Sequence, residues 1–154
     1  MSLLPFFTWC ENSPLGESIR ASLWLFPVVE SVHLLALSVI GGTVLLVSLR
    51  LLGWGMRRQS AAQLWHETRP WLWGGLLVML ASGLILFTSE AVKLYYSDAF
   101  WVKMTALLLA TAFTFTVVRR VALAGETRWS QPAGLISLLL WFCVGAAGRW
   151  IGFS

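Results

Sequence analysis

Long apolar stretches without a charged side chain recur four times along the 154-residue chain. They cover positions 31–49 and 71–89 with 19 residues each, 104–118 with 15, and 132–148 with 17. A membrane-spanning α-helix needs about 20 apolar residues, whereas the strands of a membrane barrel are about 10 residues long and alternate in polarity. Runs such as 34–37 and 76–80 show no alternation. The pattern therefore predicts four membrane-spanning helices.

With their flanking residues, the predicted spans lie at about 23–49, 71–91, 100–118 and 132–151 of one domain, 1–154. The connections at roughly 50–70, 90–99 and 119–131 are short, which makes consecutive helices antiparallel neighbours. Pro70 and Pro132 stand where the first turns of the second and fourth spans are expected. We predict an all-α, integral membrane four-helix bundle with up-down topology.

The segment ahead of the first span carries its own helix signals. Ser13 followed by Pro14 is typical of a helix cap and first turn. The residues before them are apolar and aromatic, as in an interfacial anchor: Leu3, Leu4, Phe6, Phe7 and Trp9. We therefore expect a short interfacial N-terminal helix ahead of the bundle.

Composition supports the membrane interpretation. Hydrophobic residues make up 58% of the chain and charged residues 12%, about half the roughly 25% that is usual in soluble domains. The mean hydropathy is +0.76. These values exclude a disordered chain, a disulfide scaffold and an ordinary soluble enzyme. The lipid bilayer is the expected surrounding.

Basic residues are concentrated in two of the loops. Seven of the eleven Lys and Arg residues lie there, namely Arg50, Arg57, Arg58, Arg69, Arg119, Arg120 and Arg128. Under the positive-inside rule these loops face the cytoplasm, and both termini face the other side. The arginines mark span ends and have no aromatic or Lys-rich binding surface beside them, so we expect no nucleic-acid partner.

Five ionisable residues are predicted inside the non-cytoplasmic ends of the spans. Counted from the cytoplasmic end at ~1.5 Å per residue, His33, Lys103 and Arg149 all lie at about 25 Å. Glu30 and Glu90 lie about one turn higher. Because ionisable groups inside a membrane are costly, the layer predicts an outward-opening polar pocket. The simpler alternative is that these side chains pair, snorkel and hold the bundle together.

The pocket residues are suited to an anionic or metal-containing ligand. Two cations, Lys103 and Arg149, can hold the carboxylates of a ligand. The neutral imidazole of His33 can bind a metal. Haem b combines the two needs, an axial ligand and propionates near the surface. His66 is predicted in the first cytoplasmic loop, roughly 25 Å away in depth, and cannot share a haem with His33.

Motifs for soluble enzyme chemistry are missing from the chain. It contains no H-E-x-x-H, nucleophile elbow, P-loop, C-x-x-C or dinucleotide fingerprint. Cys10 and Cys143 are predicted at different membrane depths and should not pair. Whether the protein is an enzyme stays open at this point.

Nearly the whole chain resembles an uncharacterised family of short four-span bacterial inner-membrane proteins. The resemblance rests on LWLFPVVESVHLLALSVIGGTVLLVSLRLLGW, RPWLWGGLLVMLASGLILF, FWVKMTALLLATAFTF and AAGRWIGF. More distantly, the chain is similar to CopD-type copper-resistance domains and to HemJ-type protoporphyrinogen oxidases. The shared features are a span histidine followed by a glycine and an arginine, here His33, Gly42 and Arg50, and an aromatic-x-x-Lys opening, here Phe100 and Lys103. The HemJ resemblance implies that His33 is an axial ligand of haem b.

Two functional hypotheses follow. In the first, the protein is a haem-b redox or electron-transfer protein, with His33 as ligand, Lys103 and Arg149 beside the propionates, and Glu30 orienting the imidazole. In the second, a non-redox transporter, channel or accessory subunit uses the same pocket, with Glu90, for an ion or small anion. The resemblance places either one in a bacterial inner membrane, and the positive-inside rule makes both termini periplasmic. A homo-oligomer or a larger membrane complex is compatible with both.

Overall fold

The four predicted spans are helices in the structure. The computed structural model describes residues 3–153 and has no strand in that range. The long helices are α3 (Leu25–Leu52), α4 (Ala61–Ser89), α6 (Asp98–Phe113), which continues through η1 (Thr114–Val118) and α7 (Arg119–Ala124), and α8 (Ser130–Ile151). Each of these four segments is long and apolar enough to cross a membrane. The prediction of an all-α four-helix protein is confirmed.

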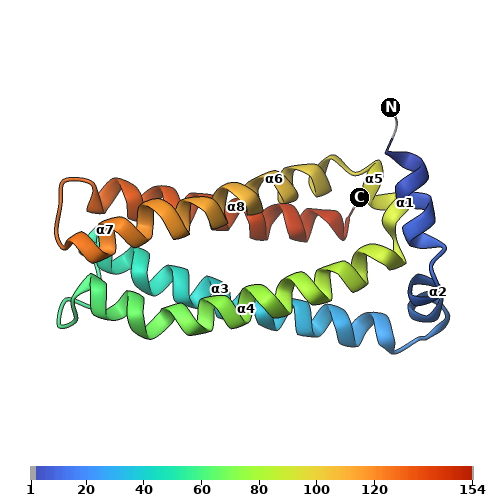
Figure 1. Cartoon of the computed structure of the whole chain (residues 1–154), viewed down its shortest axis with the longest axis horizontal. Coiled ribbons are helices and arrows are strands. Elements are labelled where there is room, and N and C mark those ends of the chain that lie inside the picture. Colours follow the sequence, from blue (N-terminus) through green and yellow to red (C-terminus); the bar gives the residue numbers. More distant parts are fainter. Residues whose placement is uncertain (1–2, 154) are drawn as a thin grey trace.

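The helices form an up-down bundle (Figure 1). α3 packs against α4 and α8, α6 packs against α8, and α7 with η1 closes the bundle against α4. The loops 53–60 and 125–129 lie at one end, which we name the arginine end. The other end, here the terminal end, carries both chain ends and three short helices: α1 (Leu4–Glu11), α2 (Pro14–Ala21) and α5 (Ala91–Tyr95).

The second long helix begins about ten residues earlier than the predicted span. Ser60 caps α4 by accepting a hydrogen bond from the backbone N–H of Gln63 at 3.1 Å. Pro70 therefore lies inside the helix, and its prediction at a first-turn position is wrong. A proline removes one backbone donor, but the packing of the first turns, in which Trp65 is buried, keeps the chain helical. His66 consequently lies on α4, where it is exposed, and its prediction in a loop is wrong.

The third span contains a π-helical segment that the sequence pattern does not reveal. η1 opens with Thr114, whose hydroxyl donates to the carbonyl of Ala110 at 2.7 Å. The indole N–H of Trp141 on α8 donates to the same hydroxyl oxygen at 3.0 Å. The TFTVV sequence of η1 is rich in β-branched residues, which are weak helix formers. The wider turn keeps Thr114 in contact with α8.

The N-terminal residues form two short helices that cover the terminal end. Ser13 caps α2 by accepting from the N–H of Gly16 at 3.2 Å, as predicted. In α1, Phe6 and Trp9 are exposed, as expected for an interfacial anchor, but Phe7 is buried. The Phe7 ring lies 5.1 Å from that of Phe87 between centroids. α1 therefore packs onto the bundle with one side and leaves the other free.

Close helix packing depends on particular glycines. A Cβ atom at Gly134 on α8 would lie 2.8 Å from the backbone oxygen of Ser48 and 3.2 Å from Leu51 on α3. Gly75, Gly83 and Gly148 also face neighbouring helices, whereas Gly41, Gly42, Gly74 and Gly145 have open space around them. Of these two sets, the glycines that face a neighbouring helix are the ones that allow the helices to pack closely.

We expect Gly134→Ala to destabilise the bundle by about 1–3 kcal/mol, because α3 and α8 must separate to admit the methyl group. Thermal unfolding in detergent measures the change. Gly145→Ala is the matched control on the same helix, since nothing lies within 4 Å of its added Cβ. Equal unfolding temperatures for the two variants would contradict the close α3–α8 contact.

Candidate functional site

His33 lies at the interface of α3 and α4. Its ring is half-buried, and its Nδ1 atom lies 2.9 Å from the hydroxyl oxygen of Ser82. A Cβ at Gly83 would lie 3.2 Å from the ring carbon Cε1. The Ser82-Gly83 pair on α4 thus provides a polar contact and the space for the imidazole.

The hydrogen bonds of Ser82 determine the tautomer of His33. The Ser82 hydroxyl donates its one proton to a backbone carbonyl, that of Val78 at 2.6 Å or of Met79 at 3.2 Å. Its oxygen must therefore accept from the imidazole, which places the proton on Nδ1. With the proton on Nδ1, the Nε2 atom keeps its lone pair. This is the state in which histidine binds metals.

Lys103 on α6 is the second basic group that the sequence places at this depth. Its side chain is half-buried. The side chain runs over Gly148 of α8, where an added Cβ would lie 3.4 Å from Nζ. Among the described residues the ammonium group has no ion-pair partner. Four helices thus hold these two basic groups and their contacts, α3 and α4 at His33 and α6 and α8 at Lys103.

None of the other three predicted residues forms a hydrogen bond or ion pair with His33 or Lys103 in residues 3–153. Arg149 is exposed, and its guanidinium lies 4.4 Å from the ring centroid of Phe153. Glu90 forms a 3.9 Å ion pair with Lys93. Glu30 is exposed and makes no hydrogen bond to His33; Ser82 takes the orienting role that we expected for Glu30.

The sequence analysis missed the contact of Ser82 and Gly83 with the histidine. The depth of the two residues in the membrane could have revealed this contact. Ser82 lies seven residues before the end of α4 and His33 eight residues after the start of α3, so the two face each other in antiparallel helices. A polar residue at the depth of a buried histidine is a candidate partner.

An aromatic cluster joins several helices at the terminal end. Phe7 packs against Phe87, Tyr95 and Phe100 with centroid distances of 5.1, 5.2 and 6.4 Å. The rings of Phe87 and Phe100 are stacked at 6.0 Å. α1 is held further by Glu11, whose carboxylate accepts from the N–H of Val92. The cluster joins α1, α4, α5 and α6 into one cap.

Further metal ligands are not gathered within residues 3–153. That part of the chain has no group of three or more His, Cys, Asp and Glu side chains placed to hold an ion. Met79 is buried in the core and Met104 is exposed. Both cysteines, Cys10 and Cys143, are free, as predicted.

Comparison with known proteins gives a family but no function. No curated protein and no solved structure matches the chain. A model described as a family of unknown function (DUF6644) matches residues 6–154. The predicted membership of an uncharacterised family is thereby confirmed, and the chain belongs to the DUF6644 family.

Proposed function

We propose that the protein binds haem b through His33 and works as a redox or electron-transfer protein of a bacterial inner membrane. The observation that carries the proposal is the hydrogen bond between His33 and Ser82. It leaves Nε2 as an unprotonated electron-pair donor inside the bundle. A histidine ligand of haem iron needs its other ring nitrogen fixed by a hydrogen bond in this way.

The basic residues fit the anionic part of a haem. Haem b carries two propionates, which are commonly held by cations near the surface. Lys103 is suited to this role because no carboxylate pairs with it in residues 3–153. Arg149 lies one residue from Gly148, which the Lys103 side chain contacts, so its guanidinium is available at the same end.

When bound, haem b supplies one-electron redox chemistry. The chain's part is to fix the imidazole through Ser82 and to offset the propionate charge with Lys103. The aromatic cap of Phe7, Phe87 and Phe100 limits access of water from the terminal end. By the positive-inside rule, this end and both termini are periplasmic in the proposal.

The alternative is non-redox binding of an ion or small anion in the same region. It is favoured by the unpaired ammonium of Lys103, which offers an anion a charged donor in a half-buried position. In this case the protein is a transporter, channel or accessory subunit, and the imidazole is a hydrogen-bonding residue.

An absorption spectrum of the protein purified after haem-replete expression separates the two functions. The haem proposal expects a Soret band that reduction shifts, with close to one haem per chain. A colourless preparation, with thermal stability raised by small anions in a Lys103-dependent manner, would support the alternative.

We expect Lys103→Gln to weaken haem retention about tenfold while leaving the position of the Soret band unchanged, because Lys103 pairs with the propionates and does not touch the iron. The measurement is haem transfer to an excess of an apo-haem acceptor protein. Lys93→Gln is the control, since Lys93 is exposed and pairs with Glu90. A shifted Soret band in Lys103→Gln would contradict this role.

A further inference from the structure

The arginine end contains a cavity of about 380 Å³ that none of the proposed haem residues lines. Its walls are the last turn of α3, the first residue of α4, the loop before α8 and the first turn of α8. This volume is within the usual range of small-ligand pockets, about 300–1,000 Å³. The charged side chains that line it are Arg50, Arg128 and Glu126, so the lining has an excess of one positive charge.

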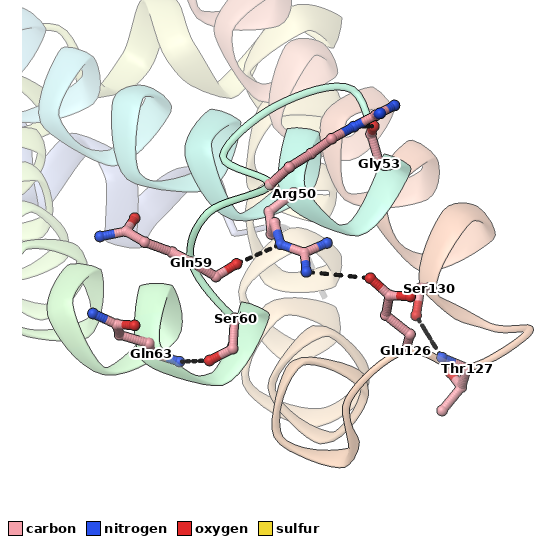
Figure 2. A network of polar contacts seen from close by, with 9 residues as sticks. Arg50, Gly53, Gln59, Ser60, Gln63, Glu126, Thr127 and Ser130 are labelled. Atoms are coloured by element: carbon pink, nitrogen blue, oxygen red, sulfur yellow. Dashed lines mark hydrogen bonds and ion pairs between the residues drawn. The ribbon is translucent and has the colours of Figure 1, made fainter.

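Arg50 lines this cavity and is the central residue of the polar network there (Figure 2). Its Nε donates to the backbone oxygen of Gln59 at 2.7 Å, and its Nη2 donates to Glu126 at 3.2 Å. Its side chain is 14% exposed. A guanidinium has five N–H groups, so three of them have no acceptor in residues 3–153. A mostly buried arginine with free donors is suited to a further anionic partner.

The ion pair of Arg50 with Glu126 is weak enough to be replaced. The Glu126 side chain is 84% exposed, and the 3.2 Å contact is longer than the 2.7–2.9 Å typical of charge-assisted bonds. Exposed carboxylates contribute little to such pairs. Glu126 therefore acts as an internal anion at the mouth of the cavity. Nearby, the hydroxyl oxygen of Ser130 accepts from the N–H of Thr127 at 3.0 Å.

We propose that this cavity binds a phosphate group, with Arg50 as the main contact, Arg128 as a second cation and Glu126 as the group that phosphate displaces. Arginine recognises phosphate through paired N–H donors. Trp54 and Trp129 are exposed beside the cavity, as at a membrane–water interface. The phosphate source is an anionic lipid headgroup or a free phosphate ion, and both present the same chemistry.

The test uses the full-length protein in detergent and measures thermal unfolding during titration. One arm compares titration with inorganic phosphate and titration with chloride at the same ionic strength. The other arm compares phosphatidylglycerol with phosphatidylcholine, each added in mixed micelles. A stabilising response to either phosphate source, absent with its comparator, supports the proposal and identifies the source. No specific response in either arm overturns it.

Three variants distinguish a ligand site from a simple link between loops. Arg50→Gln is expected to weaken the apparent affinity at least about tenfold. Glu126→Gln is expected to strengthen it several-fold, because the competing carboxylate is gone. Arg57→Gln is the control, since Arg57 is exposed and its Nε donates to the carbonyl of Gly53. If Arg50→Gln does not fold, Glu126→Gln alone decides: an unchanged or weaker response there overturns the proposal.

A second, independent observation concerns the middle of the bundle. The hydroxyl oxygens of Ser48 on α3 and Ser137 on α8 are buried and have no hydrogen-bond partner within residues 3–153. Both line a cavity of about 10 Å³, together with Thr43, Thr68 and Thr114. Unpaired hydroxyls are costly in an apolar interior, and a cavity of this size holds about one water.

We infer that one water molecule occupies this cavity as part of the fold. The hydroxyls of Thr43 and Thr68 already donate to backbone carbonyls, so their oxygens are free to accept from a water. Ser48 and Ser137 have protons to donate to it. The water then has two donors and two acceptors around it, which satisfies all four of its hydrogen bonds.

The sign of the stability change in Ser48→Ala and Ser137→Ala tests the inference. If the site is dry, each substitution removes an unpaired polar group and raises the unfolding temperature. If water is bound, each lowers it by about 2–6 °C. Ser38→Ala is the control, since Ser38 is exposed and bonds to its own helix. Higher stability in both variants overturns the water site. Stability that falls when sodium is replaced by choline also overturns it, because the occupant would then be a sodium ion.

Discussion

Replacing His33 by alanine is expected to remove the Soret band of the purified protein completely. The imidazole is the axial ligand in the proposed site, and alanine leaves the iron without its protein bond. The measurement is the ratio of Soret to protein absorbance after expression with excess haem. Thermal unfolding of the apo-protein shows whether the variant still folds.

His66→Ala provides the matched control for this prediction. His66 is the second of the two histidines in the chain, is exposed on α4 and lies toward the arginine end. We expect it to retain haem at the wild-type level. A normal Soret band in His33→Ala, or a loss in His66→Ala, would place the ligand elsewhere.

Replacing Ser82 by alanine is expected to weaken haem retention by about 10–100-fold, the usual effect of removing a hydrogen bond behind a ligating histidine. Without the Ser82 oxygen, the ring is free to rotate and to change its tautomer. The measurement is the rate of haem transfer to an acceptor protein, together with the reduction potential. Ser82 touches no haem in the proposal, so the Soret band should remain.

The control for Ser82 is Ser38→Ala on the helix that carries His33. Its hydroxyl donates to the carbonyl of Leu34 at 2.9 Å, a bond like that of Ser82 to its own helix, with no histidine attached. Equal haem retention in Ser38→Ala and wild type is expected. Wild-type retention and potential in Ser82→Ala would show that the histidine is oriented by another group.

The four spans could be predicted because charge and hydropathy alone decide which segments enter a bilayer. The start of α4 could not, since residues 61–70 are polar enough for a loop and become helical through the Ser60 cap and the burial of Trp65. The π-helix at Thr114 could not be predicted from the sequence pattern either. It depends on a contact with Trp141, which lies 27 positions further along the chain.

The candidate site could be predicted by depth but not by direction. Counting residues along each helix placed His33 and Lys103 at one level, and both side chains are half-buried in the structure. The same count placed Arg149 there, yet its side chain stacks on Phe153 at the surface. Helix rotation decides which side chains face inward, and it is set by packing at residues such as Gly83 and Gly148.

The most direct test of the account is pulsed electron paramagnetic resonance of the ferric protein with 15N-labelled histidine. The His66→Ala variant, purified without a histidine tag, makes His33 the remaining histidine of the chain. The account expects hyperfine coupling between the haem iron and a 15N imidazole nitrogen. A ferric haem signal without that coupling, or a protein that binds no haem, would contradict it.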